Sequence, residues 1–314
     1  MNNTEAINKE IYEEALRWVH GNKGTTINPN AASYPSPRIS SELPDCSMPL
    51  TFDSYNFCSL GCSYCFAYIF KLNNPSLSTK EIQLKSINVN HLIDVMSGKF
   101  KSDYDQAFYE YFYKNKFLFH WGGLADPFCN FELANGVGYK LMNFLGDMNY
   151  PTLFSFKGAT IFQKKYSDLF AKFSDQANFA FQVSMVTADD NMAKTVEVGV
   201  PLPQKRFAAL KMLSDMGYWT ILRLRPFIIG VTDCSLDELL NKALASGINA
   251  VSMEFYAMDV RAPVAMRARY EWLAKAIGVS GGADGLMSYF KHLSPSERGS
   301  YLRLNRLVKE IYVK

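Results

Sequence analysis

Three cysteines lie close together in the sequence, in the pattern Cys58-x₃-Cys62-x₂-Cys65. Gly61 permits a tight backbone turn between the first two, so that the three thiols can converge on one metal centre. Three thiolates are one fewer than a closed zinc or iron–sulfur site uses. The pattern therefore predicts a [4Fe–4S] cluster in which one iron keeps a coordination position open for chemistry.

A structural zinc site is the alternative for the same thiols. It would need a fourth ligand, and the histidines do not follow the cysteines at the spacing of a zinc finger. Among His20, His91, His120 and His292, we expect only His120, at the end of a predicted strand, to be placed where it could reach them. Three thiols alone therefore favour the cluster over zinc.

The remaining cysteines are scattered along the chain, and we expect them to be buried, small apolar side chains. They are Cys46, Cys129 and Cys234. Six cysteines in 314 residues are too few for a disulfide framework, which indicates a reducing compartment. A second cluster would need further ligands from distant elements and is not expected.

The composition is that of an ordinary globular protein, with 48% hydrophobic and 20% charged residues. The net charge of +3 is too small to demand a nucleic-acid or membrane partner. No run of about 18 apolar residues suggests a membrane span, and residues 1–9 lack the apolar core of a signal peptide. We therefore expect a cytoplasmic protein without a membrane partner.

Short apolar runs alternate with helical patterns through the middle of the chain, which predicts parallel strands joined by helical crossovers. The predicted strands are 50–57, 117–121, 152–156, 179–184, 218–224 and 249–255, and the helices between them lie near 90–113, 132–147, 160–173, 204–216 and 236–246. Six such strands make an α/β fold, a partial (β/α)₆ TIM-like barrel.

Two other regions flank this barrel. Residues 1–48 combine a helix near 5–20 with a Pro- and Asn-rich segment that is typical of an extended arm. Residues 263–314 read as a helical C-terminal extension, with helices near 264–278, 283–292 and 295–312. The predicted division is therefore an arm at 1–48, a core at 49–262 and an extension at 263–314.

Polar and glycine residues follow the predicted strands, at the barrel edge where active sites form. The cysteine loop follows the first strand. The others, in chain order, are Gly122 and Gly123, Lys157, Ser184, Arg223 with Arg225, and Glu254. Arg223 and Arg225 share one strand face, and buried cations there would need an anion, which a cofactor, a substrate or Glu254 could supply.

The segment Cys58-x₃-Cys62-x-Tyr64-Cys65, placed after the first strand of a βα repeat, resembles the cluster motif of radical S-adenosylmethionine (SAM) enzymes. Tyr64 matches the aromatic residue that the family places before its last cysteine. The resemblance implies that SAM chelates the open iron and that electron transfer cleaves it to a 5′-deoxyadenosyl radical, which abstracts hydrogen from a substrate. It also implies a reductant such as flavodoxin or ferredoxin.

The rest of the rim is similar to the spore photoproduct lyase-like branch of that family. The resemblance implies SAM contacts for Lys157, for Ser184 and for the backbone carbonyls of Gly122 and Gly123. The acidic residue expected after the glycine pair is Leu124 here, so Asp126 either replaces it or caps the following helix. An ammonium and a hydroxyl suit the SAM carboxylate, although surface and capping roles are the structural alternatives.

Two positions depart from that branch. The cysteine that donates hydrogen in photoproduct lyases corresponds to Gly123, and their second tyrosine corresponds to Phe66. Repair of DNA photoproducts by that mechanism is therefore not expected.

Other questions remain open at the level of sequence. Glu197 and Arg206 are expected to form an ion pair, which could border the SAM ribose. The substrate could be a small molecule, a peptide or a nucleic acid. The alternative function is a zinc or iron–sulfur interaction module, without SAM chemistry, whose basic last helix contacts nucleic acid.

Overall fold

A computed structural model describes residues 26–28, 32–39, 48, 50–65, 67, 83–174, 178–256 and 264–291 of the chain. The predicted helices near 5–20 and 295–312 lie outside these residues, as do Cys46 and Phe66. The predicted boundaries at 48 and 262 stay predictions.

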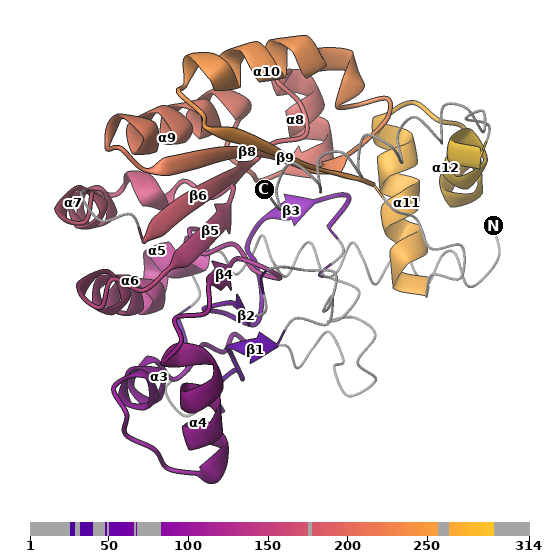
Figure 1. The fold of residues 1–314 in the computed structure, drawn as a ribbon. Helices are drawn as coiled ribbons and strands as arrows, with labels where there is room; N and C mark the ends of the chain where they lie inside the picture. The colour runs from indigo at the N-terminus through magenta and orange to yellow at the C-terminus, as the bar shows by residue number, and fades with distance from the viewer. Residues whose placement is uncertain are drawn as a thin grey trace.

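A seven-stranded sheet forms the centre of the fold (Figure 1). Its strands, in spatial order, are β1 (Arg38–Ile39), β2 (Leu50–Phe52), β4 (Phe119–Trp121), β5 (Thr152–Phe156), β6 (Phe179–Ser184), β8 (Trp219–Phe227) and β9 (Ala250–Phe255). All pairings from β2 to β9 are parallel, which confirms the predicted α/β class and the partial barrel. The strands β5 and β6 begin and end at the predicted residues.

The first predicted strand is shorter than the pattern at 50–57 indicated. It ends at Phe52 because the next side chain, Asp53, turns to the loop after β4 and accepts hydrogen bonds from Leu124 and Ala125. At the other side of this strand, β1 pairs antiparallel with β2 and adds a strand that the sequence did not predict. Arg38 on β1 fixes this edge through an ion pair with Asp53 at 2.6 Å.

Helices follow the strands and lie along the outer face of the sheet (Figure 1). The α-helices are α3 (Val89–Met96), α4 (Asp103–Phe108), α5 (Asn130–Asn135), α6 (Val137–Asp147), α7 (Lys164–Lys172), α8 (Asp190–Val196), α9 (Pro203–Asp215) and α10 (Leu236–Ala245). A π-helix, η2 (Tyr109–Tyr113), and two 3₁₀-helices, η3 (Thr160–Phe162) and η4 (Asp233–Ser235), adjoin them. Two further helices, α11 (Val264–Ala276) and α12 (Gly282–Lys291), lie side by side beyond β9 and belong to the predicted extension.

The long helix predicted at 90–113 is divided, and so is the helix predicted at 132–147. Gly98, with a φ of 80°, ends the first part of 90–113, and Ser102 caps α4 by accepting from the Asp105 amide. Gly136, with a φ of 64°, separates α5 from α6. Positive φ values favour glycine and stop helices, which explains both divisions.

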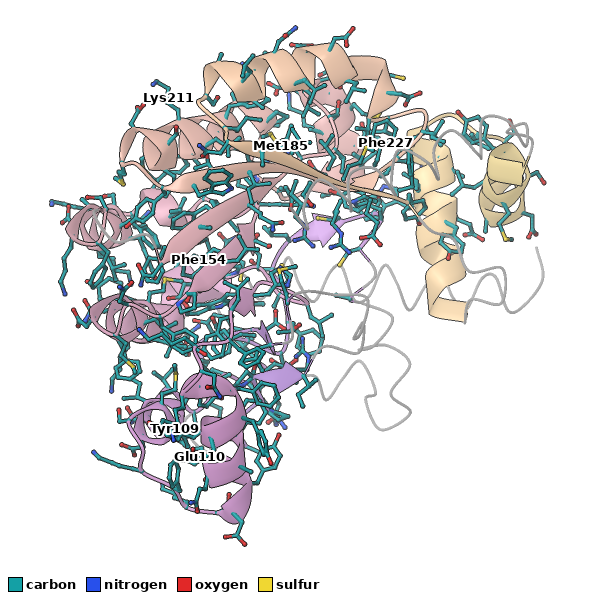
Figure 2. All side chains as sticks on the ribbon, in the orientation of Figure 1. Tyr109, Glu110, Phe154, Met185, Lys211 and Phe227 are labelled. Carbon is teal, nitrogen blue, oxygen red and sulfur yellow. The ribbon has the colours of Figure 1, made fainter. Side chains whose placement is uncertain are left out.

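Side chains alternate between the two faces of the strands, as they must in a pleated sheet. Aromatic residues face the helices and form the main core, where Phe154 stacks on Phe181 with ring centroids 5.1 Å apart (Figure 2). Lys211 on the outer side of α9 is exposed to solvent in the same view. The opposite face carries polar side chains, among them His120, Ser155 and Gln182. The sheet therefore has an apolar outer face and a polar inner face.

No helix in the described part of the chain is long and apolar enough to cross a membrane.

Candidate functional site

The cysteine loop is anchored by a small second sheet. Its strand β3 (Gly61–Cys62) pairs antiparallel with β7 (Glu197–Val198), which places Cys62 opposite Glu197. The Ser63 amide donates to the carbonyl of Val196 at 2.9 Å and extends this contact. Cys62 is buried, whereas Cys58 and Cys65 are partly exposed. The loop after β2 is thus held against the segment that follows α8.

A buried network of charged and polar groups adjoins Cys62. The Nζ atom of Lys157 lies 2.6 Å from the Tyr64 hydroxyl, 3.3 Å from Oε1 of Glu197 and 3.7 Å from the Cys62 sulfur. Tyr64 donates to Glu197, and Arg206 pairs with the other carboxylate oxygen of Glu197 at 2.5 Å. This confirms the predicted ion pair between Glu197 and Arg206. The structure brings Tyr64, Lys157 and Cys62 together, although they come from separate segments.

Charge pairing decides the ionisation of this network. Burial raises the pKa of Glu197, but Arg206 and Lys157 outweigh burial and hold that pKa below its usual value. Burial also lowers the pKa of Lys157, but the neighbouring Cys62 and Glu197 raise it above its usual value. Burial raises the pKa of the Cys62 thiol to about 11, while Lys157 opposes this rise. Lys157 is therefore a fixed ammonium group beside a predicted metal ligand.

The loop after β4 carries the predicted glycine pair. Gly122 has a φ of 105°, and a β-carbon on it would lie 2.1 Å from the carbonyl oxygen of Ser155. A β-carbon on Gly123 would lie 2.3 Å from a methyl group of Thr51. Because Asp53 accepts from the next two amides, at 2.8 Å each, the pair is held rigidly between β2 and β5. Both positions therefore require glycine.

Asp126 joins two loops at the carboxyl end of the sheet. One carboxylate oxygen accepts from the Phe128 amide at 2.8 Å. The other accepts from the backbone amides of Lys157 and Gly158. The side chain thus orders the loops after β4 and β5. The capping alternative was wrong, because α5 begins at Asn130 with Cys129 as its N-cap and no side-chain cap. The contact of Asp126 with SAM stays a prediction.

Arg223 belongs to a different polar group, on the inner face of the sheet. Its Nη1 lies 2.7 Å from Oε1 of Gln182, 3.0 Å from the hydroxyl of Ser155 and 3.3 Å from Nε2 of His120. Since arginine can only donate, Nε2 of His120 acts as the acceptor and the ring proton lies on Nδ1. Burial, and then the charges of Arg223 and Arg225, hold the pKa of His120 well below its usual value. His120 is therefore neutral.

Two other predicted residues have backbone or ionic partners. The buried Ser184 ends β6, and its carbonyl oxygen accepts from Arg206 at 2.8 Å. Arg225 forms an ion pair with Glu254, one of the partners that the sequence allowed.

Of the scattered cysteines, Cys129 and Cys234 lie within the described residues. The loops that carry Cys58 and Cys129 are joined by a hydrogen bond from the Asn130 amide to the Ser59 hydroxyl at 2.9 Å. Cys129 is buried, as predicted. The expectation for Cys234 was wrong, because this residue lies in the turn η4 and is exposed. The sequence did not predict the hydrogen bond between Asn130 and Ser59, since the two residues lie on separate loops.

The three-cysteine loop fits an iron–sulfur cluster by the chemistry of its donors. Thiolates are the ligands of such clusters, and all three belong to one loop at the carboxyl end of the parallel sheet. In the described part of the chain, no three histidine, cysteine, aspartate or glutamate side chains are gathered as a metal site. The thiol of Cys62 lies beside Lys157, and Cys58 and Cys65 flank Cys62 in the same loop. Their convergence on one metal stays a prediction.

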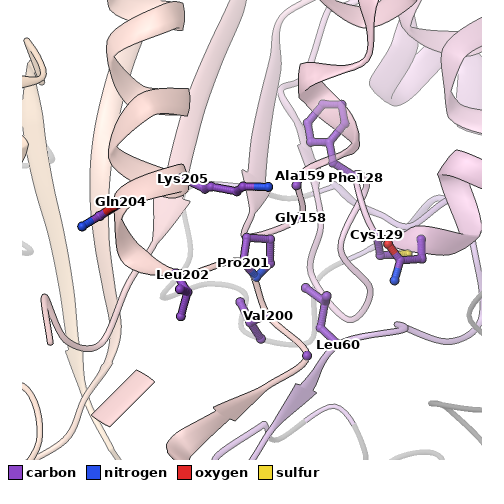
Figure 3. A pocket seen from close by; sticks show the side chains of 12 residues that line it. Leu60, Phe128, Cys129, Gly158, Ala159, Val200, Pro201, Leu202, Gln204 and Lys205 are labelled. Atoms are coloured by element: carbon purple, nitrogen blue, oxygen red, sulfur yellow. The ribbon is translucent and has the colours of Figure 1, made fainter. Parts of the chain in front are cut away.

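A cavity of about 500 Å³ opens behind this loop (Figure 3). It lies between the cysteine loop, the loops after β4 and β5, and the start of α9. Its lining consists of Leu60, Phe128, Cys129, Asn130, Gly158, Ala159, Gly199, Val200, Pro201, Leu202, Gln204 and Lys205. The sequence did not indicate this cavity, because its walls come from four separate segments.

Comparison with known proteins identifies the fold. No family model matches the chain, and no curated protein matches it. Among solved structures, spore photoproduct lyase complexed with dinucleoside spore photoproduct matches at 15% identity with a TM-score of 0.58, covering 81% of this chain and 69% of that one. A variant of that lyase with bound AdoMet and dinucleoside spore photoproduct matches with the same identity and coverage and a TM-score of 0.57. This chain shares their fold.

Proposed function

We propose that this protein is a radical SAM enzyme. The observation that carries the proposal is the three-cysteine loop at the carboxyl end of a parallel sheet, with the Lys157 ammonium beside Cys62. The shared fold with spore photoproduct lyase supports it, since one of those structures contains AdoMet. When bound, a [4Fe–4S] cluster would supply the electron that cleaves SAM to methionine and a 5′-deoxyadenosyl radical.

The side chains divide the binding task. Cys58, Cys62 and Cys65 would hold the cluster. Lys157 donates to Tyr64 and pairs with Glu197, and its third contact is the long one of 3.7 Å to the Cys62 sulfur. The SAM carboxylate would take the place of this long contact and accept from the ammonium group.

The neighbouring loops would orient the rest of SAM. The carbonyls of Gly122 and Gly123 would accept from its amino group, because no side chain shields the backbone there. Ser184 and Asp126 would border the same ligand from the ends of β6 and β4. Arg223, on the polar inner face, would contact SAM or the substrate.

Photoproduct repair is not the proposed reaction. A cysteine at position 123 would place its β-carbon 2.3 Å from Thr51, so this loop has no room for a hydrogen-donating thiol there. We propose instead a different substrate, which is a small molecule, a peptide or a nucleic acid, and a reductant such as flavodoxin or ferredoxin. A reducing compartment such as the cytoplasm would keep the thiols available.

Anaerobic reconstitution with iron and sulfide tests the proposal. We expect iron–sulfur absorbance, an electron paramagnetic resonance signal after reduction, and release of 5′-deoxyadenosine from SAM. The variant with Cys58, Cys62 and Cys65 all changed to Ala should lose all three signals, whereas Cys234→Ala should keep them. Tight zinc in aerobic preparations, with salt-sensitive nucleic-acid binding and no 5′-deoxyadenosine, would favour the interaction module instead.

A further inference from the structure

One carboxylate fastens the N-terminal arm to the loop after β4. Oδ2 of Asp53 accepts from Nη2 of Arg38 at 2.6 Å, and Oδ1 accepts from the amides of Leu124 and Ala125 at 2.8 Å each. The Asp53 residue is completely buried. Its two oxygens therefore join β1, the last described part of the arm, to the loop that carries the predicted glycine pair.

The hydrogen bonds from the loop depend on the charge of Asp53. A buried carboxylate is costly unless it is paired with a cation. Among the described residues, Arg38 is the one cation that forms an ion pair with it. Burial raises the pKa of Asp53, and the charge of Arg38 is the largest effect that opposes this rise. Loss of Arg38 would therefore favour the protonated acid, which accepts more weakly than a carboxylate.

Other contacts fix the guanidinium group of Arg38 in this position. Its Nη1 donates to the Tyr34 hydroxyl at 2.7 Å, and the Tyr34 amide donates to the carbonyl of Ser86 at 2.7 Å. Arg38 pairs with Thr51 where β1 lies beside β2 (Figure 1). Its Nη2 lies 3.8 Å from the position of a β-carbon on Gly123. Arg38 therefore adjoins the glycine pair itself as well as the carboxylate that holds the loop.

We propose that Arg38 is a positioning residue for the SAM amino group. It acts through Asp53, which holds the two amides that follow Gly122 and Gly123 and so fixes the direction of the glycine carbonyls. A backbone that is fixed before the ligand arrives has little conformational freedom left to lose on binding. The inference rests on the proposed function, which assigns the SAM amino group to these carbonyls. The arm thus contributes to the cofactor site, which the sequence did not predict.

Hydrogen–deuterium exchange of the full-length, cluster-free protein tests the effect on the loop. In Arg38→Met, the peptide that covers residues 122–126 should lose protection, whereas the peptide that covers β6 should not change. The double variant Arg38→Met/Asp53→Asn should recover protection, because a neutral amide oxygen can accept from the same amides without a nearby cation. Lys211→Met is the control for loss of an exposed positive charge. Unchanged protection of 122–126 in Arg38→Met, or an equal loss in β6, would overturn the inference.

Ligand binding tests the effect on the SAM amino group. Equilibrium dialysis of anaerobically reconstituted protein compares SAM with 5′-methylthioadenosine, which lacks the amino and carboxylate groups. Arg38→Met should raise the dissociation constant of SAM about fivefold, as expected for one lost hydrogen bond, and leave that of methylthioadenosine unchanged. Arg38→Lys keeps a positive charge beside Asp53 and should recover most of the affinity.

The possible failures are distinguishable. An unchanged affinity for SAM in Arg38→Met, or equal weakening of both ligands, would overturn the positioning role. Wild-type protein that binds no SAM would instead contradict the proposed function. Loss of protection at residues 122–126 in Arg38→Met would then show that Arg38 orders the loop, and that the error lies in the ligand assigned to it.

Discussion

Three groups around Lys157 stabilise the positive charge of its ammonium group. Tyr64 and Glu197 accept from its ammonium group, and the Cys62 sulfur lies next to it. Arg206 shares Glu197, so this carboxylate is neutralised from two sides and remains ionised. The arrangement leaves the Lys157 side chain 12% exposed, and a ligand carboxylate could pair with its ammonium group.

Replacing Lys157 by Met should therefore weaken SAM binding. A hydrogen bond to a charged group contributes about 1.5–3 kcal/mol, so the dissociation constant should rise about tenfold or more. Equilibrium dialysis of SAM with anaerobically reconstituted protein measures this change. Lys211→Met is the matched control, because Lys211 is exposed on α9 and pairs only locally with Asp215. Equal dissociation constants for Lys157→Met and the wild type would remove Lys157 from the SAM site.

His120 should make the protein sensitive to mild acid. Its folded-state pKa lies well below the ordinary value of 6.5, because of burial and the charges of Arg223 and Arg225. Below pH 6.5, therefore, His120 is protonated in the unfolded chain but stays neutral in the folded chain. The free energy of unfolding then falls as pH decreases, by up to about 1.4 kcal/mol per pH unit.

Urea unfolding of the wild type and His120→Gln between pH 5 and pH 8 measures this effect. The variant should lose that part of the acid sensitivity, and the difference in slope between the two proteins should vanish well above pH 6.5. Parallel pH dependences throughout would show that position 120 does not titrate in this way.

The loop after β4 depends on contacts to both neighbouring strands. Gly122 donates to the carbonyl of Phe52 at 2.9 Å, and Asp53 holds the following amides. Gly122 itself packs against the Ser155 carbonyl of β5. Three consecutive elements of the sheet thus determine one loop conformation.

Gly122→Ala should accordingly destabilise the protein more than a glycine substitution in open space. Gly98 also has a positive φ, 80°, but nothing lies within 4 Å of its would-be β-carbon. Gly98→Ala should cost about 1–2 kcal/mol from the backbone conformation alone. Gly122→Ala adds a clash at 2.1 Å with Ser155, so its free energy of unfolding should fall further. Urea titrations compare the two, and equal losses would contradict the packing argument.

Elements differed in how well the sequence predicted them. The strands β5 and β6 were predicted to the residue, because each is a short stretch rich in phenylalanine and other residues that favour strands. The segment predicted as one helix at 90–113 is divided into α3, α4 and η2. Gly98 ends the first helix and Ser102 caps the second, but neither residue interrupts the apolar pattern from which the single helix was predicted. The strand β1 has two residues and carries no periodicity to detect.

At the scale of the whole molecule, ligands that bind only the folded chain should stabilise it. The proposed cluster would hold the cysteine loop in one conformation, and SAM would bridge the loops after β4, β5 and β6. At one hundred times its dissociation constant, SAM should add about 2.7 kcal/mol to the free energy of unfolding. Anaerobic unfolding with and without SAM measures this increment. The variant lacking all three loop cysteines should show none, and an equal increment there would separate SAM binding from the cluster.

Properties of neighbouring residues were available from the sequence alone. The three-thiol spacing, the alternation of apolar strands and helices, and the polar residues after each strand predicted the α/β class and a ligand-binding edge. Local hydrophobic pattern and ligand spacing carry this information because they act over one element or one loop. The resemblance to radical SAM enzymes also came from the sequence alone. The binding of the cluster and of SAM stays a prediction.

Contacts between distant segments were decided only by the tertiary structure. Tyr64 meets Glu197 across 133 positions because β3 pairs with β7, and Lys157 on the loop after β5 meets Cys62 across 95. The cavity beside the cysteine loop arises in the same way. No local pattern encodes such partners, since folding brings together side chains whose separations in sequence exceed any helical or strand period.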